Sequence, residues 1–505
     1  MREKQYLLQR YAAIASSIGL ILLLTGALMF TPLLVLPWRP EELGQAWAFV
    51  LPAVCQCSLG LVLWRAFGGR ARDALTVQEG GVIVVLGWAL VILFSAWPFT
   101  AVLGLPFSRA VFESVSGWTT TGLSVVDVTR AGWMILLWRS VIQLAGGAGL
   151  AIIMLSAIVG PVGAGVTSAE GRGDQLAPHV RRSARLVLVI YGCYAIAGTV
   201  AYWLVGMSFF DALNHSFAAV STGGFSTRVE SIGYWDSAVI EAVTIPLMIL
   251  GNLSFVTAWL LWRGRLRLVA LNGEARLMAV LIPLCAAAVF LLTSRALYPT
   301  LEKSLRVALF ETVTALTTTG FSTVGYGDWN AFGLMALIVL MIIGGGTCST
   351  AGGVKQFRVY LLWRMLCWEI KRGLVPKSVV LERPLWEGEA RVFVDDGRVR
   401  QAAVFVFLYL ATYMLGVMVL CACGYDLSQA LFEFASAMGT VGLSIGVTSA
   451  QMPDVALWAE TLAMFLGRLE LIVVVVSLLK LGVDGRKMLA RRRGGRTRSL
   501  HWAAR

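Results

Sequence analysis

The stretch TTTGLS at residues 119–124 decides the fold, because the same kind of phrase recurs three more times along the chain. The other copies read STGGFS at 221–226, TTTGFS at 317–322 and GTVGLS at 439–444. Each copy ends in Gly, then Phe or Leu, then Ser, and its glycines (Gly122, Gly224, Gly320 and Gly442) are spaced 102, 96 and 122 residues apart. Repetition at this period indicates a fourfold internal repeat, and it points to a pore built from one chain.

A polar residue stands nine positions before each of these glycines: Glu113, His215, Glu311 and Glu433. Each opens a short semi-apolar run, near 108–120, 210–222, 306–318 and 428–440. Runs of about a dozen residues are too short to cross a bilayer, so they predict re-entrant helices. We expect the three glutamates to begin these helices, where a carboxylate suits the positive helix end.

The composition requires a bilayer as solvent, since the chain is 58% apolar and 14% charged, with a mean hydropathy of +0.75. Ten candidate spans lie at 12–36, 46–64, 81–103, 132–160, 186–209, 236–262, 277–294, 332–363, 402–424 and 455–482. They predict an all-α polytopic membrane protein in which four repeats, each a span, a pore helix and a second span, surround one pore with pseudo-fourfold symmetry. The predicted regions are two extra N-terminal helices (1–79), repeats at 80–160, 161–263, 264–368 and 401–483, a linker (369–400) and a basic tail (484–505).

The net charge of +13 is concentrated in every second loop and in the tail. By the positive-inside rule this pattern places these loops and both termini in the cytoplasm. The basic tail is then an anchor to lipid headgroups rather than an arm for nucleic acid. Within the linker, Asp395–Gly397 between RVFV and RVR predicts the turn of a small hairpin.

Each second span contains a Gly break, 24 to 27 residues after the repeated Gly: Gly146-Gly147, Gly251-Asn252, Gly344-Gly345-Gly346 and Gly467-Arg468. For the first, second and fourth breaks, close helix packing through small residues is the favoured interpretation. The third is different, because residues 343–353 read IGGGTCSTAGG with no large polar or aromatic side chain, and Lys355 follows. Such a stretch disfavours a helix, and a polar loop across the permeation path would be a gate.

The chemistry of the repeated phrase suits a dehydrated alkali cation, which needs several oxygens to replace its water shell. Rings of backbone carbonyls supply these oxygens, and Gly gives the backbone the freedom to point them inward. A second phrase, TVGYGD at 323–328, matches the filter of tetrameric potassium channels. The other repeats have nothing similar at that place, so no ring could form. We therefore expect it on the outer mouth, beyond the filter.

Arg468 lies within the apolar stretch LAMFLGRLELIVVVV, where an unpaired cation is costly. Two interpretations stay open: a cation that faces the pore below the filter, or a salt bridge with Glu460 or Glu470.

With the four phrases, IGGGTCSTAGGVK at 343–355 and Arg468, the chain resembles the Trk/Ktr/HKT superfamily of potassium-uptake proteins over about 80–482. The two extra N-terminal spans are similar to the TrkH/TrkG type, whereas FEFASAMGTVGLS at 432–444 is similar to the KtrB type. The resemblance implies a K⁺ filter at Thr119, Thr120, Thr121, Gly122, Ser221, Thr222, Gly223, Gly224, Thr317, Thr318, Thr319, Gly320, Gly439, Thr440, Val441 and Gly442. It implies a gate formed by Gly344, Gly345, Gly346, Thr347, Ser349, Thr350, Gly352, Gly353, Lys355 and Arg468.

The same resemblance implies potassium uptake across a bacterial inner membrane, a homodimer, and a TrkA/KtrA-like cytosolic subunit that carries the nucleotide. No cofactor is expected in this chain, and no enzymatic activity. Two rivals are a sodium- or proton-coupled cation symporter and a secondary transporter with repeats. Unit two departs from the family pattern, since His215 replaces an acid and Gly223 precedes the filter Gly.

Overall fold

The computed structural model describes residues 2–68, 77–149, 180–376, 382–387 and 390–494. Two N-terminal helices, α1 (Arg2–Leu28) and α2 (Trp47–Phe67), are joined by the 3₁₀ turns η1 (Thr31–Val35) and η2 (Pro40–Gln45). They pack through glycines, because a Cβ on Gly19 would lie 2.7 Å from the carbonyl oxygen of Gly60, and one on Gly60 would lie 2.6 Å from that of Gly19. Small residues permit this backbone contact between membrane helices.

Four units of similar construction follow. Their first spans are α3 (Val77–Leu103), α8 (Val180–Leu204), α13 (Gly273–Val289), which continues through the π-helical turn η5 (Phe290–Ser294) into α14 (Arg295–Leu297), and α18 (Asp396–Ala422). Their pore helices are α4 (Phe107–Trp118), α9 (Phe209–Val220), α15 (Leu301–Leu316) and α19 (Leu427–Gly439). Their second spans begin with α5 (Trp133–Ala148), α10 (Ala238–Asn252), α16 (Ala331–Ile343) and α20 (Asp454–Leu469).

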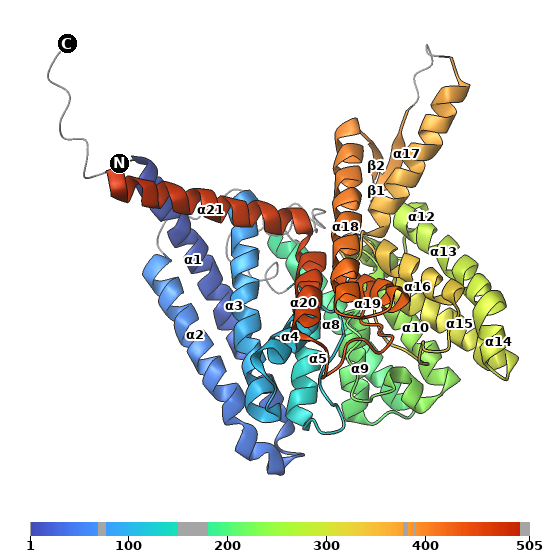
Figure 1. Ribbon diagram of the computed structural model, residues 1–505, viewed down its shortest axis with the longest axis horizontal. Coiled ribbons are helices and arrows are strands. Elements are labelled where there is room, and N and C mark those ends of the chain that lie inside the picture. Colours follow the sequence, from blue (N-terminus) through green and yellow to red (C-terminus); the bar gives the residue numbers. More distant parts are fainter. Residues whose placement is uncertain (1, 69–76, 150–179, 377–381, 388–389, 495–505) are drawn as a thin grey trace.

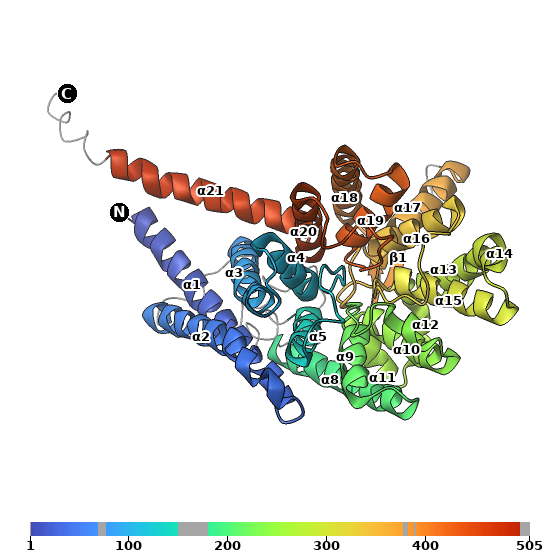
Figure 2. The ribbon, with the colours of Figure 1, turned by 60° about the horizontal axis from the view of Figure 1, so that its bottom comes forward.

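The units close into a ring. The second span of each unit contacts the pore helix of the next: α5 with α9, α10 with α15, α16 with α19, and α20 with α4. Figure 2, which brings the lower end of the molecule forward, shows the units following one another around a common centre. Side chains on the pore helices are largely buried, so the middle of the ring is the core of the protein.

No second span continues straight past its Gly break in the part of the chain that the structure describes. Helices α10 and α11 (Phe255–Trp262) meet at a bend of 116°, and helices α20 and α21 (Leu471–Gly494) meet at a bend of 99°. The short helix α12 (Leu266–Leu271) follows α11, and a loop separates α16 from α17 (Gln356–Leu374). The helices of the sixth, eighth and tenth candidate spans are therefore interrupted at or next to the Gly breaks that the sequence showed, and in unit three by the predicted loop. Among the described residues, six helices are long and apolar enough to cross a membrane, or eight if each bent pair counts as one span.

Those glycines nevertheless also pack closely, as predicted for three of the breaks. A Cβ on Gly146, Gly251 or Gly467 would fall on the carbonyl oxygen of Trp118, Val220 or Met438, near the end of the pore helix in the same unit. Helices α5, α10 and α20 therefore each approach the repeated loop of their own unit at a glycine, and each ends within a few residues of that glycine. The part of the fourth candidate span at 150–160 lies outside the described residues. So do the basic loop residues at 70, 72, 172 and 377, on which the predicted orientation partly depends.

Helix α21 runs across the top of the bundle in Figure 1, beside the N-terminal end of α1. The predicted boundary at 484 falls inside this helix, and 495–505 lie outside the described residues. The linker does form a hairpin, with β1 (Pro384–Glu387) antiparallel to β2 (Ala390–Phe393). Its turn was predicted wrongly, however, because Asp395 accepts a hydrogen bond from the backbone of Arg398 (3.1 Å) and caps α18.

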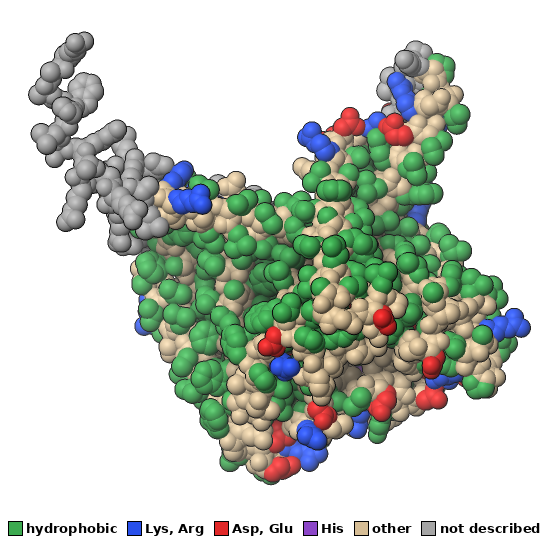
Figure 3. All heavy atoms as spheres, viewed as in Figure 1, with side chains coloured by type: hydrophobic (Ala, Val, Ile, Leu, Met, Phe, Trp, Pro, Cys, Tyr) green, Lys and Arg blue, Asp and Glu red, His purple; other side chains and the backbone are tan. Residues whose placement is uncertain are grey.

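Figure 3 shows apolar side chains over most of the middle of the visible face, with charged side chains near its lower edge and on the projecting upper ends. This distribution is the one expected of a protein whose middle faces lipid, since polar groups are costly there.

Candidate functional site

The four repeated phrases form four loops, each directly after a pore helix, and all four share one unusual backbone conformation. Thr120, Thr222, Thr318 and Thr440, two positions before the repeated glycines, have positive φ values of 54°, 51°, 53° and 49°. A β-branched residue in the left-handed region is strained and persists only where its surroundings impose it. The same strain at four matching positions indicates that this loop shape is required.

The loops meet each other through backbone at the repeated glycines, whose φ values are +100°, +71°, +80° and +99°. A Cβ added to any of them would fall on a carbonyl oxygen of the next unit. The pairs, in order around the ring, are Gly122 with Gly223, Gly224 with Thr319, Gly320 with Val441, and Gly442 with Thr121. The fourth contact returns to the first unit, so the four loops that contain the sixteen predicted filter residues meet in one closed ring.

Beyond the ring lies a cavity of about 760 Å³, which we call the vestibule. Residues from all four units line it, including the repeated glycines and the serines two positions after them: Ser124, Ser226, Ser322 and Ser444. The vestibule therefore gives access to the centre of the ring from one side.

The polar residue nine positions before each Gly holds the loop from behind. Glu113 accepts hydrogen bonds from Ser124 Oγ (3.0 Å) and Val125 N (3.1 Å), and forms an ion pair with Arg139 (2.7 Å). His215 Nε2 lies 2.8 Å from Ser226 Oγ, so the imidazole does in unit two what a carboxylate does elsewhere.

The remaining two units use the same device with different partners. Glu311 accepts from Thr323 N (2.9 Å) and from the hydroxyl of Tyr326 (2.5 Å). Glu433 accepts from Ser444 Oγ (2.7 Å) and from the backbone of Ile445 and Thr448.

The prediction that these glutamates begin the pore helices is wrong. Each lies within its helix, and each is fully buried. The sequence places polar atoms that need partners two to three residues after each Gly, and a carboxylate or imidazole in the helix interior supplies them.

The channel-like phrase TVGYGD lies beside the vestibule, as the sequence predicted, and not in the ring. Thr323 and Tyr326 turn inward to Glu311, while a Cβ on Gly325 or Gly327 would have no atom within 4 Å. A ring of carbonyl groups needs backbones that approach each other closely. In this unit the backbone of Gly320 approaches the next unit closely, and those of Gly325 and Gly327 do not.

The Gly-rich segment of unit three is a loop between α16 and α17, as predicted. It is held against itself by a backbone hydrogen bond from Gly345 N to Gly352 O (3.0 Å), and against unit two by Gly346 N, which donates to the side-chain oxygen Asn252 Oδ1 (3.1 Å). Ser349 Oγ donates to Gly346 O (2.6 Å), and Val354 N to Ile342 O (2.9 Å). The loop is therefore an ordered turn rather than a free strand of chain.

Thr350 and Gly352 of this loop contact all four strained threonines, on the side of the ring opposite the vestibule. Thr120 Oγ1 donates to Thr350 O (3.4 Å), and the hydroxyls of Thr222 and Thr350 lie 3.0 Å apart. Gly352 N donates to Thr318 Oγ1 (2.8 Å), and a Cβ on Gly352 would fall on Thr440 Oγ1. The loop thus lies across the inner end of the ring.

Arg468 joins this loop to the first unit. Its guanidinium donates to the carbonyl oxygens of Thr350 and Gly146 (2.7 Å for the latter). The two carboxylates considered as partners are bonded elsewhere, Glu470 to Arg358 (2.7 Å) and Glu460 to Thr448 (3.0 Å). Lys355, at φ +84°, donates to Ala351 O, so both predicted cations contact backbone of the loop.

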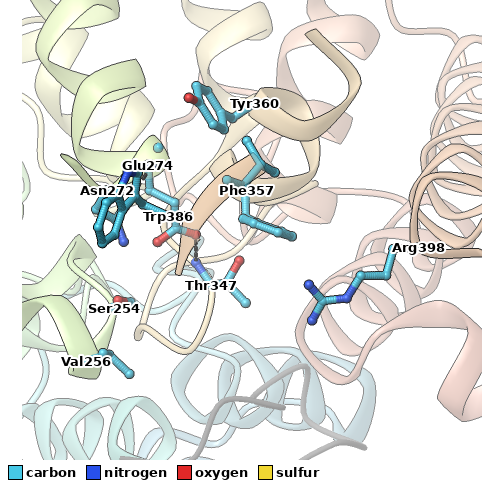
Figure 4. Close-up of a pocket in the computed structure, with 11 residues that line it drawn as sticks. Ser254, Val256, Asn272, Glu274, Thr347, Phe357, Tyr360, Trp386 and Arg398 are labelled. Atoms are coloured by element: carbon cyan, nitrogen blue, oxygen red, sulfur yellow. Dashed lines mark hydrogen bonds between the residues drawn. The ribbon is translucent and has the colours of Figure 1, made fainter. Parts of the chain in front are cut away.

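A carboxylate holds the loop from the opposite side. Thr347 N donates to Glu274 Oε1 (2.6 Å), at the start of α13. This contact borders a cavity of about 80 Å³ between the loop, α17 and the hairpin, which Trp386 and Arg398 also line. Figure 4 shows Glu274 directed at Thr347, with Arg398 across the cavity.

Glu274→Ala should free the loop, because the backbone of Thr347 loses a charged acceptor; if the loop blocks an ion path through the ring, ion flux through the isolated protein should rise. A hydrogen bond to a charged group contributes about 1.5–3 kcal/mol, so the open form of the loop should gain roughly tenfold or more. Rubidium uptake into proteoliposomes measures the effect. Glu274→Gln keeps an acceptor oxygen and is the matched control; a flux unchanged or lowered by Glu274→Ala would contradict the prediction.

Sequence reasoning missed Arg139, Gln143 and Glu274, and it named Asn252 only as part of the Gly break of unit two. Gln143 donates to Gly223 O and accepts from Phe225 N (3.2 Å), and a Cβ on Gly223 would fall on its side chain, which explains the extra Gly of unit two. A signal existed, since Arg139 and Gln143 are polar residues one turn apart in an apolar span.

Comparisons with known proteins agree with this geometry. The TrkH family model, described as "Cation transport protein", matches residues 53–484. The Trk system potassium uptake protein TrkH of Halomonas elongata is 31% identical over 91% of this chain and 96% of its own length. TrkG of Escherichia coli, another Trk system potassium uptake protein, is 29% identical over 91% of this chain and 96% of its own.

The crystal structure of the potassium transporter TrkH from Vibrio parahaemolyticus superposes with a TM-score of 0.81 at 28% identity, covering 93% of this chain and 98% of that one. This match confirms the predicted fold class, an all-α polytopic protein with the four-repeat architecture. The chain belongs to the TrkH family of cation transport proteins.

Proposed function

We propose that the chain takes up potassium through the ring of four loops, and that the loop at 344–355 gates it. The observation that carries this proposal is the closed circle of contacts from each repeated glycine to a carbonyl oxygen of the next unit. A ring of backbone carbonyls replaces the water shell of K⁺ without a fixed charge. The TrkH family is one of cation transport proteins, which supports transport rather than an enzymatic reaction.

The gate is supported by the contacts of Thr350 and Gly352 with all four strained threonines. An ion that leaves the ring away from the vestibule would meet this loop first. Displacement of the loop would open the path, with Arg468, Lys355 and Glu274 holding it when closed.

Orientation and partners complete the proposal. The positive-inside pattern supports a multi-pass protein of the bacterial inner membrane with the hairpin and both termini in the cytoplasm. The vestibule then faces outward, and uptake runs from it toward the loop. A homodimer and a cytosolic nucleotide-binding subunit are proposed on the resemblance of the sequence to Trk systems.

Growth of a potassium-uptake-deficient bacterium on submillimolar potassium tests the function. We expect the wild-type chain to restore growth when it is expressed with the regulatory subunit of its own genome. Potassium uptake with no requirement for a sodium or proton gradient would support a channel-like path. No rescue, with the protein present in the membrane, would favour the secondary transporter.

A further inference from the structure

A pair of buried carboxyl groups behind the repeated loop of unit four has no counterpart in the described residues of the other units. Glu460 on α20 and Glu433 on α19 are both fully buried, and both contact the hydroxyl of Thr448: Glu433 Oε1 at 2.5 Å and Glu460 Oε2 at 3.0 Å. Neither carboxyl group forms an ion pair with a Lys or Arg that the structure describes.

Comparison of the units shows what is unusual. Arg139 and Glu460 occupy matching positions, each seven residues before the glycine that packs on the end of the pore helix, Gly146 or Gly467. In unit one the pore-helix carboxylate therefore faces a guanidinium at 2.7 Å. In unit four it faces a second carboxyl group, so an acid stands where unit one has a cation.

Hydrogen-bond counting locates one proton in this pair. A hydroxyl carries a single hydrogen, so Thr448 Oγ1 donates to one carboxyl group and must accept from the other. Glu433 already accepts from Ser444 Oγ, Ile445 N and Thr448 N, which is the environment of an ionised carboxylate. Glu460 contacts Thr448 through Oε2 (3.0 Å), and its Oε1 has no hydrogen-bond partner in the described chain. A buried carboxylate with so few hydrogen bonds is poorly stabilised, so the proton belongs on Glu460 Oε2, which donates to Thr448 Oγ1.

We propose that Glu460 and Glu433 form a proton-binding site behind the fourth filter loop, with a hydrogen-bond chain from Glu460 O–H to Thr448 and from Thr448 O–H to Glu433. The bound proton takes the place of the positive charge that Arg139 supplies in unit one. Two adjacent buried carboxyl groups cannot both ionise without strong repulsion, which makes the proton part of the folded unit.

The other titratable groups near α20 do not supply a counter-charge. Arg109 on α4 donates to Ala450 O (2.7 Å) and pairs with Asp454 (3.6 Å), and the Tyr413 hydroxyl on α18 donates to Leu431 O (2.8 Å). Of the cations on α20 and α21, Arg468 donates to the carbonyl oxygens of Thr350 and Gly146, and Lys480 pairs with Glu79 (3.2 Å) and Asp484 (3.4 Å). Arg398 and Arg400 lie in the first two turns of α18, and Arg486 and Lys487 lie beyond Asp484 on α21. Glu113 and Glu470 are paired with Arg139 and Arg358, and Tyr409, Tyr425, Cys421 and Cys423 carry no positive charge.

The site makes the filter sensitive to alkali. Loss of the proton to external hydroxide leaves two negative groups on one hydroxyl, and the segment from Ser444 to Thr448 then loses its fixed position. The stabilisation of the segment from Ser444 to Thr448 is therefore present while Glu460 is protonated, and it is lost as the pH rises and Glu460 loses its proton. This consequence rests on the proposed potassium uptake, whereas the proton itself does not.

Infrared spectroscopy of the purified full-length protein tests the site without transport, because a protonated carboxyl group has its own carbonyl stretching band. We expect Glu460→Gln to remove one such band that the wild type shows. Asp454→Asn, an exposed acid on the same helix, should leave it unchanged. A band that persists in Glu460→Gln would overturn the proposal. If Glu460→Gln fails to fold, Thr448→Val provides the second test, since it should shift the band by removing its acceptor, and an unshifted band would count against the site.

Rubidium uptake against external pH then tests the link to the filter. We expect wild-type uptake to fall several-fold as the band disappears at alkaline pH, and Glu460→Gln to keep its uptake over that range. A decline of the same size in both proteins would overturn the link. A protonated band in a protein that transports no rubidium at any pH would instead contradict the proposed function and leave the proton site standing.

Discussion

Gly320→Ala should abolish potassium-dependent growth, whereas Gly325→Ala, five residues away, should leave it intact. The first change places a methyl group on the carbonyl oxygen of Val441, at a residue whose φ is +80°. Backbone cannot yield there without breaking the ring, and an L-residue at positive φ costs roughly 1–2 kcal/mol in addition. A Cβ on Gly325 has no atom within 4 Å.

Growth on limiting potassium measures both variants, with membrane levels of each protein compared by immunoblot. Sodium uptake should be assayed alongside, since a ring forced apart would lose its discrimination before it loses all conduction. The opposite result, in which Gly325→Ala alone destroys uptake, would mean that TVGYGD forms the filter and that the four-loop ring does not.

The second large effect is expected on stability. Glu113→Ala removes the partner of Arg139, a guanidinium whose side chain is 3% exposed. Arg139 also donates to Ser124 Oγ (2.9 Å) and to Ser226 O (3.1 Å), so it ties the loop of unit one to that of unit two. Loss of one member of a buried ion pair costs about 3–5 kcal/mol, because the other charge is left unpaired.

Thermal unfolding in detergent measures this loss, and we expect Glu113→Ala to unfold at a markedly lower temperature. Asp127→Asn is the control, because Asp127 pairs with Arg130 (3.3 Å) on the outer surface, where an ion pair contributes little. Asp127 is also a charged group in the folded protein, because hydrogen bonds from Thr129 lower its pKa. The control therefore removes one negative charge, as Glu113→Ala does, without touching the Glu113–Arg139 pair. Equal unfolding temperatures for Glu113→Ala and the wild type would contradict the structural role of the pair.

Repetition made the ring predictable from the sequence. Four matching phrases located the loops and the pore helices to within a few residues, except that α15 begins five residues before the predicted run. Comparing the repeats also rejected TVGYGD, which occurs once. The bends were harder to predict: the 116° and 99° bends lie at the Gly breaks of units two and four, where the sequence favoured close packing and did not show that the helices end.

The glutamates show a different limitation. Their spacing was correct and their position in the helix was not, because the spacing to the repeated Gly shows how far each glutamate lies from the loop and not how many helical residues precede it. Residues 301–306 of α15 are mostly polar, yet they form its first turns, capped by Thr300. Glu274 gave no local signal at all, since its partner lies 73 residues away.

The closed circle of backbone contacts has a wider consequence, because all four quarters are encoded separately in one polypeptide. In an assembly of identical subunits, any change is made four times at once. Here each quarter is free to specialise while the others preserve the common opening. Unit three alone carries the Gly-rich loop, unit one uses an arginine behind its turn, unit two a histidine, and unit four a second acid. A division of labour among quarters is thus available to a fused chain and closed to a symmetric tetramer.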